Sequence, residues 1–423
     1  MNGLTLIFLA ALGLGLTLEY WLLWRQARAV TTHRDRVPEP FTGQVTPEQH
    51  RKAADYTLAK IVHARASLAV GTLLLLGWTL GGGLELLDRL WRQAPLPEPW
   101  PGVGLLLSVV LVSAVLELPL ELWHTFGIEA RFGFNRTTPR RFLLDRLLGA
   151  ALLLALGAPL AALVLWLMER AGDGWWLWAW VAWMGFTLFV SWAWPTFIAP
   201  LFNRFTPLQD AALKRRLEAL LERCGFRSSG MFVMDGSKRS SHGNAYFTGL
   251  GSNKRIVFYD TLLERLEPEE IEAVLAHELG HFRRHHVGKN LLLMGLSSLA
   301  GLALLAWLLE QPGFFTGLGV SRPSAAVGLA LFLLVLPVFT RFLAPLFNAL
   351  SRRHEFEADD FAARQSDASA LIDALVKLYR DNAATLTPDP LYSAFHHSHP
   401  PAPVRIGHLS SRIDKEPHRD EST

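Results

Sequence analysis

The chain carries little charge and almost no cysteine. Charged side chains make up 19% of the 423 residues, and the formal net charge is only +3. So small an excess of positive charge gives no support for a surface that binds nucleic acid. Cys224 is the single cysteine, so an intrachain disulfide framework is excluded.

Hydrophobic residues are abundant instead. They make up 50% of the chain, which includes 15 Trp and 25 Phe, and this composition is typical of a membrane protein. The first apolar run has no Lys or Arg before it and no clear cleavage site after it, so we predict an uncleaved helix rather than a signal peptide. Seven stretches have the length and low charge of helices that cross a bilayer, namely 4–24, 66–88, 103–123, 148–168, 175–199, 289–309 and 324–345.

Lys and Arg are concentrated in the loops after the first and third of these stretches. Because cytoplasmic loops carry an excess of positive residues, this side is predicted to be cytoplasmic, with the N-terminus outside and the C-terminus inside. Two long polar blocks, 200–288 and 346–423, would then face the cytoplasm. The sequence therefore predicts a multi-pass protein of the inner (cytoplasmic) membrane.

The segment His277-Glu278-Leu279-Gly280-His281 places two imidazoles on one face of a helix, with a carboxylate beside them. Two such histidines can bind one zinc ion through ring nitrogens at about 2.0–2.1 Å. Glu278 cannot easily share the metal, but it can take a proton from the attacking water and pass it to the departing amine. The segment is therefore half of a zinc peptidase site.

Local patterns predict a helix for this segment and a small sheet next to it. Pro268 suits a first helical position and basic residues lie near the end, which predicts a helix over 268–286. Short β-type runs at 230–235 and 255–259 lie on either side of a Gly-rich stretch, 243–251. We therefore expect a small sheet beside the zinc helix.

Zinc needs at least one more protein ligand, and the segment after the last apolar stretch supplies carboxylates. Glu355 and Asp359 are four residues apart, so one can bind the metal while the other orients a ligand histidine. Glu357 points elsewhere by the same periodicity.

His285 and His286 follow the zinc segment, but a fourth imidazole would close the position that water needs. Neither histidine is therefore assigned to the site.

Further motifs are spread along the chain. They are Phe132-Gly133-Phe134-Asn135, Pro200-Leu201-Phe202, Asp235 through Ser240, Asn244 through Gly249, Arg255-Ile256-Val257, Asp260-Thr261-Leu262, Ser351-Arg352-Arg353 with Glu355 through Asp359, and His399-Pro400-Pro401. Together with the zinc segment, they resemble the CAAX prenyl protease type 1 family of membrane zinc endopeptidases. The resemblance covers nearly the whole chain, and its length and short loops are typical of a bacterial member.

The resemblance implies a division of roles at the metal. His277, His281 and Glu355 would bind one Zn²⁺ per chain. Glu278 would be the catalytic base. Asp359 would not touch the metal but would hold a ligand in place.

The resemblance also implies residues that handle the substrate. Asn244, Ala245 and Tyr246 would lie along the cleft as an edge strand and bind the substrate backbone by strand addition. An ordinary hairpin turn is the alternative for this stretch. His399 and Arg405 would lie near the metal and stabilise the tetrahedral oxyanion. Without the resemblance, His399 would be interpreted as a loop histidine.

The predicted fold is a mainly α-helical polytopic membrane protein with about seven transmembrane helices and a gluzincin-like zinc peptidase domain that contains a small β-sheet. Members of the family enclose a chamber within a ring of helices, so the resemblance implies a chamber here. The predicted parts are 1–200, a module of five transmembrane helices; 201–288, a cytoplasmic peptidase core; 289–345, a transmembrane hairpin; 346–412, a cytoplasmic part with the third zinc ligand; and 413–423, a polar tail.

The predicted activity is hydrolysis of peptide bonds by zinc-activated water. Its predicted partners are the lipid bilayer and a peptide or protein substrate that is prenylated or membrane-associated; no oligomeric state is predicted. An HtpX-like quality-control protease is one alternative, although the five apolar stretches before the zinc segment count against it. A non-catalytic metal-containing receptor or transporter is the other, and it would have no need for Glu278.

Overall fold

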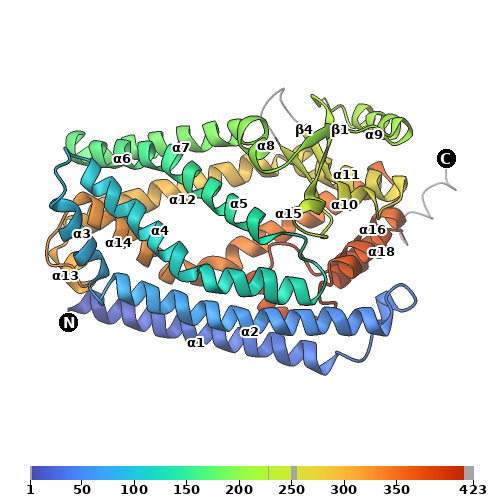
Figure 1. The fold of residues 1–423 in the computed structure, drawn as a ribbon. Helices are drawn as coiled ribbons and strands as arrows, with labels where there is room; N and C mark the ends of the chain where they lie inside the picture. Colours follow the sequence, from blue (N-terminus) through green and yellow to red (C-terminus); the bar gives the residue numbers. More distant parts are fainter. Residues whose placement is uncertain (1, 227, 249–254, 414–423) are drawn as a thin grey trace.

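The computed structural model describes residues 2–226, 228–248 and 255–413. Long helices run side by side along the molecule, and a sheet with shorter helices lies at one end (Figure 1). The described part is mainly helical with one small sheet, which confirms the predicted fold class. Residues 414–423 of the predicted tail, and Gly249 of the predicted substrate motif, lie outside the described residues.

Within the described part of the chain, seven helical segments are long and apolar enough to cross a membrane, the number predicted from the sequence. Several of them include a short π-helical or 3-10 turn. They are α1 (Gly3–Thr32), α2 (Pro47–Trp78), α4 (Trp100–Leu122) continued to Glu129, α5 (Pro139–Leu152) with α6 (Ala158–Arg170), α7 (Trp175–Ala193) with α8 (Ala199–Phe202), α12 (His286–Leu309), and α14 (Ala325–Thr340) with α15 (Ala344–Gln365).

The second predicted span, 66–88, is wrong at both ends. α2 begins at Pro47, where Thr46 and Gln49 form a capping box, and its polar first half precedes the apolar stretch. α2 ends at Trp78 because three successive glycines follow closely, and Gly82 among them has a φ of 77°. Residues Gly83–Arg92 then form a separate helix, α3.

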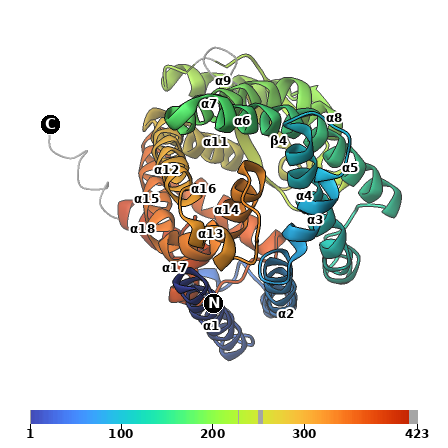
Figure 2. The same cartoon turned by 90° about the vertical axis from the view of Figure 1, so that its left-hand side faces the viewer.

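The membrane-spanning segments form a closed ring, which Figure 2 shows end-on. In order around the ring, the contacting neighbours are α1, α2, α4, α6, α7, α12 and α14, and α14 contacts α1 again. α14 also leans into the ring, where it contacts α4 and α6 (Figure 2). At the end that carries α3 and α13 (Pro312–Gly317), the buried side chains of Phe8, Trp78, Leu105 and Phe315 belong to one apolar cluster. This cluster fills that end of the ring, while a chamber further inside stays a prediction.

The sheet has four strands in the order β1-β2-β4-β3. The strands β2 and β4 are parallel, and the other two pairs are antiparallel. Because β3 pairs with β4 alone among the described strands, it lies at an edge, as the resemblance implied. The bounds are β1 (Phe205–Pro207), β2 (Met231–Met234), β3 (Ala245–Thr248) and β4 (Arg255–Tyr259).

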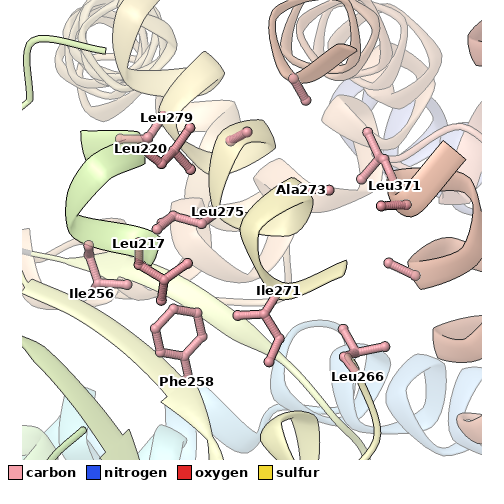
Figure 3. Close-up of a cluster of buried hydrophobic side chains, with 14 of the residues drawn as sticks. Leu217, Leu220, Ile256, Phe258, Leu266, Ile271, Ala273, Leu275, Leu279 and Leu371 are labelled. Atoms are coloured by element: carbon pink, nitrogen blue, oxygen red, sulfur yellow. The ribbon is translucent and has the colours of Figure 1, made fainter. Parts of the chain in front are cut away.

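Apolar packing fixes the zinc helix, α11 (Pro268–Arg283), against the sheet and two other helices (Figure 3). Ile271 of α11 lies in one buried cluster with Phe258 of β4, Leu217 of α9 (Ala211–Arg223) and Leu371 of α16 (Ala368–Asp381). Burial of one such side chain contributes roughly 1.5–3 kcal/mol. The remaining short helices are α10 (Asp260–Leu263), α17 (Pro390–His396) and α18 (Ala402–Ile413).

The zinc helix is shorter than the predicted 268–286. It ends at Arg283 because His285 adopts a left-handed conformation, with a φ of 56°. The chain therefore turns, and His286 becomes the first residue of α12. The turn places His286 back beside the zinc helix, which matters for the site described next.

Candidate metal and catalytic site

The two helices that carry the predicted ligands touch backbone to backbone. Gly280 of α11 faces Ala358 of α15, and a Cβ placed on Gly280 would lie only 2.9 Å from the Cα of Ala358. Glycine permits this approach because it has no side chain. The approach brings Glu355 of α15 to the imidazoles of His277 and His281.

The three predicted ligands converge on one point. His277 Nε2 lies 3.2 Å from His281 Nε2, and the carboxylate oxygens of Glu355 lie 3.5 Å and 3.3 Å from these two nitrogens. Ligand atoms held by one tetrahedral zinc ion at about 2.0–2.2 Å are about 3.3 Å from one another. The residues therefore already have the spacing and the donor types that fit a zinc ion.

The second ring nitrogen of His277 is held from behind the site. Its Nδ1 donates to Asp359 Oδ1 at 2.9 Å, and the Asp359 side chain is fully buried. Arg405 donates from Nε and Nη2 to both oxygens of Asp359, at 2.9 Å and 2.5 Å. A hydrogen on Nδ1 leaves the lone pair on Nε2, so Asp359 selects the tautomer that can bind a metal.

Opposing effects act on the charge of His277. Burial and Arg405 lower its pKa, whereas hydrogen bonds to Asp359 and Glu355 raise it by more, to about 9. A protonated imidazole cannot bind a metal, so metal binding at this site displaces a proton. The affinity for metal is therefore expected to fall as the pH falls.

A matching arrangement holds His281, and the sequence analysis missed it. His281 Nδ1 lies 3.0 Å from His286 Nδ1, and His286 Nε2 lies 3.1 Å from Glu357 Oε2. With its lone pair on Nε2, His281 donates from Nδ1 to His286, which in turn donates from Nε2 to Glu357. His286 and Glu357 belong to the site although neither touches the metal position. The left-handed turn at His285, which no sequence pattern announced, places His286 there.

Replacing His286 with Phe is expected to weaken zinc binding about 10-fold to 100-fold, because His281 loses the group that fixes its ring. Phe keeps most of the ring volume in this buried position. The measurement is competition for zinc between the purified protein and a coloured chelator. The control is His408→Phe, since His408 of α18 binds Asp360 instead of a metal ligand. Equal zinc affinity in wild type and His286→Phe would show that His286 has no part in holding the ligand.

Glu278 lines a cleft of about 930 Å³ together with His277, His281 and Glu355. Burial raises the pKa of its carboxyl group. A carboxylate with a raised pKa is a stronger base than an ordinary one. Its position in the cleft and the direction of this shift are both compatible with the predicted role as a base.

The two predicted oxyanion-stabilising residues reach the site in different ways. His399 is an exposed residue whose Nδ1 lies 3.4 Å from Glu355 Oε1, at the mouth of the cleft. Arg405 is buried, and its Nη1 lies 3.6 Å from Glu355 Oε2 while its other nitrogens bind Asp359. The geometry supports a structural role for Arg405, and its role at the oxyanion stays a prediction.

The predicted substrate-binding strand reaches the cleft only in part. Asn244 and Ala245 line the cleft, and Ala245 also packs against the apolar core. Neighbouring residues of a strand point to opposite faces, and the Tyr246 hydroxyl contacts Met234 Sδ at 3.8 Å. The side chain of Tyr246 therefore does not line the cleft, although its backbone lies in the edge strand.

Two protein families match consecutive parts of this chain. Residues 26–204 match the CAAX prenyl protease N-terminal family, described by five membrane helices. Residues 207–413 match peptidase family M48. The first match covers α2 to α8, and the second covers β2 to β4, the zinc helix and the later helices through α18.

Several curated proteins are similar over almost their whole length. The CAAX prenyl protease 1 homolog of Dictyostelium discoideum is 33% identical over 409 residues, which is 93% of this chain and 94% of that protein. The Homo sapiens homolog is 33% identical and covers 93% of this chain and 92% of its own. The Saccharomyces cerevisiae CAAX prenyl protease 1 is 30% identical, with 94% and 93% covered.

A solved structure has the same fold. The crystal structure of S. mikatae Ste24p superposes with a TM-score of 0.88 at 29% sequence identity, over 97% of this chain and 99% of that one. Sequence and fold therefore agree over both halves of the molecule. The chain belongs to the CAAX prenyl protease 1 family of peptidase family M48, and it is a metalloprotease embedded in the membrane.

Proposed function

We propose that this chain is a zinc endopeptidase that cleaves lipidated or membrane-associated peptides and proteins. His277, His281 and Glu355 would hold one zinc ion, and Glu278 would be the catalytic base. One observation carries the proposal: the two ring nitrogens lie 3.2 Å apart, and each has an oxygen of Glu355 within 3.5 Å. That spacing fits a tetrahedral metal ion, and Glu278 lies in the same cleft.

A zinc ion bound there would supply Lewis-acid polarisation of the scissile carbonyl and of the attacking water. The chain's own residues move the proton. Glu278 accepts it from the water and donates it to the departing amine. His399, exposed at the mouth of the cleft, is placed to donate a hydrogen bond to the oxygen that becomes negative. Arg405 keeps Asp359 ionised and aligned, which holds His277 in the binding tautomer.

Strand addition would align the substrate. β3 has a free edge among the described strands, and its first residues border the cleft. An extended peptide that pairs with this edge would lay its backbone past Glu278. Because main-chain hydrogen bonds do not depend on side chains, this mode of binding permits varied substrate sequences.

The relatives carry the name CAAX prenyl protease 1, and we propose a related substrate class for this chain. The seven segments long and apolar enough to cross a membrane suit an enzyme whose substrates are anchored in the bilayer. The excess of Lys and Arg on one side supports a cytoplasmic catalytic end, with the N-terminus outside. The HtpX-like alternative is not favoured, since the matches extend over the whole helical module.

The test is mass spectrometry of peptide panels, in which each sequence is offered with and without a farnesyl cysteine. The purified protein is expected to cleave peptides, to lose this activity with a strong chelator, and to regain it when zinc is added. A requirement for the farnesyl group would identify prenylated proteins as the substrates, whereas equal cleavage would indicate general turnover. Cleavage that persists after the metal is removed would contradict the proposal.

A further inference from the structure

A second pocket, of about 500 Å³, adjoins the catalytic cleft. It lies between α2 and the segments that lead into and out of α17. Tyr379, Ala384 and His399 line both the pocket and the cleft, so the two spaces meet at these side chains. Since His399 Nδ1 is also 3.4 Å from the Glu355 ligand, the pocket begins next to the metal position.

This pocket is lined by a lysine that has no ion-pair partner in the described part of the chain. Lys60 lies on the membrane helix α2 and is only partly exposed. Its Nζ lies 4.0 Å from the centre of the Tyr56 ring, and among the described residues no carboxylate forms a hydrogen bond or ion pair with it. The nearby Glu129 already accepts from the Tyr56 hydroxyl and contacts His242. A charged group in a membrane helix usually has a partner or a function.

The rest of the pocket also suits an anion. None of its lining residues in the described chain is Asp or Glu. The imidazole of His397 forms no hydrogen bond or ion pair with the described side chains, and it lines the wall beside Ser398. These groups can donate hydrogen bonds to oxygen atoms, and Lys60 supplies a positive charge. A carboxylate has the charge and the acceptor geometry that this set would bind.

We propose that the Lys60 pocket binds the C-terminal carboxylate of the peptide substrate. The proposal rests on the peptidase function proposed above. A terminal carboxylate is the anion that every peptide carries, whatever its sequence. With that end held beside the cleft, the peptide is cut at a fixed short distance from its C-terminus. Lys60 is thereby a substrate-binding residue that determines where the chain is cut.

The test compares a labelled peptide that ends in a free carboxylate with the same peptide ending in a carboxamide. Binding is measured by fluorescence anisotropy to the full-length protein in detergent, in a Glu278→Gln background so that the peptide stays intact. The free acid is expected to bind about 10-fold tighter than the amide, the scale of one charge-assisted hydrogen bond. Lys60→Met should remove this preference by weakening the binding of the free acid alone, and Lys60→Arg should retain most of the preference.

The matched control is Lys52→Met, because Lys52 is an exposed lysine on the same helix. It should keep the full preference for the acid. A carboxamide peptide that ends in Glu is a third arm: if it binds as tightly as the free acid, the pocket does not recognise the chain terminus and the proposal fails. If the protein with Lys60 unchanged binds the free acid and the carboxamide equally tightly, the proposal is also overturned.

Hydrolysis by the wild type is followed separately. If both peptides are hydrolysed but bind equally well, the pocket assignment is wrong and the peptidase function stands. If a preference for the acid depends on Lys60 but no peptide is hydrolysed, the carboxylate site stands and the proposed catalysis is wrong. The cleavage position adds a further readout: extension of the peptide at its C-terminus should move the cut by the same number of residues in wild type, and Lys60→Met should scatter it.

Discussion

Replacing Glu278 with Gln is expected to lower the rate of peptide hydrolysis about 10²-fold to 10⁴-fold while zinc stays bound. Glutamine has the same shape but cannot accept a proton, so water is no longer activated by this side chain. The metal should remain because its three ligands are His277, His281 and Glu355. The measurements are kcat with a peptide substrate and zinc content by mass spectrometry of the same sample.

The control for this prediction is Glu264→Gln, since Glu264 is an exposed glutamate away from the cleft. It should be fully active. A Glu278→Gln protein with wild-type kcat would remove Glu278 as the base. A variant that had lost both activity and zinc would show instead that Glu278 supports the metal site.

Replacing Arg405 with Met is expected to lower the free energy of unfolding by about 3–5 kcal/mol, because the buried carboxylate of Asp359 loses its guanidinium partner and keeps only the contact with His277. Asp359 is 0% exposed and Arg405 is 8% exposed. Met fills a similar volume, so the loss is one of charge pairing rather than packing. Unfolding is followed with denaturant in detergent, in the presence of chelator, so that a change in zinc binding does not contribute.

Arg412→Met provides a closely matched control. Arg412 joins the same two helices, α18 and α15, by binding Asp360, but its side chain is 45% exposed. An exposed ion pair of this kind contributes about 0–1 kcal/mol. Similar losses for the two variants would contradict the account of a buried pair that supports His277.

The zinc segment and the apolar stretches could be recognised from the sequence because each is a local pattern. Two histidines four residues apart share a helical face wherever the helix lies, and a span of apolar residues marks a bilayer crossing. The same logic failed for α2, whose first half is polar and helical. Apolar length describes where the membrane lies and not where the helix begins. The five-part division of the chain and its bacterial origin stay predictions.

Tertiary contacts explain what the sequence did not predict. His286 was set aside as an unwanted fourth imidazole, yet the left-handed His285 turns it against His281 at Nδ1. Glu357 does point away from the metal, as its periodicity predicts, and meets His286 instead. Lys60 lies far from the zinc segment along the chain, so only the packing of α2 beside α16 reveals its pocket.

The central claim is that His277, His281 and Glu355 together hold one zinc ion. X-ray diffraction from crystals of the zinc-loaded protein, recorded on both sides of the zinc absorption edge, tests it most directly. The account predicts one anomalous peak per chain, about 2.0–2.2 Å from both Nε2 atoms and from a Glu355 oxygen. A peak that lies elsewhere, or one in which His286 replaces any of the three ligands, would contradict it.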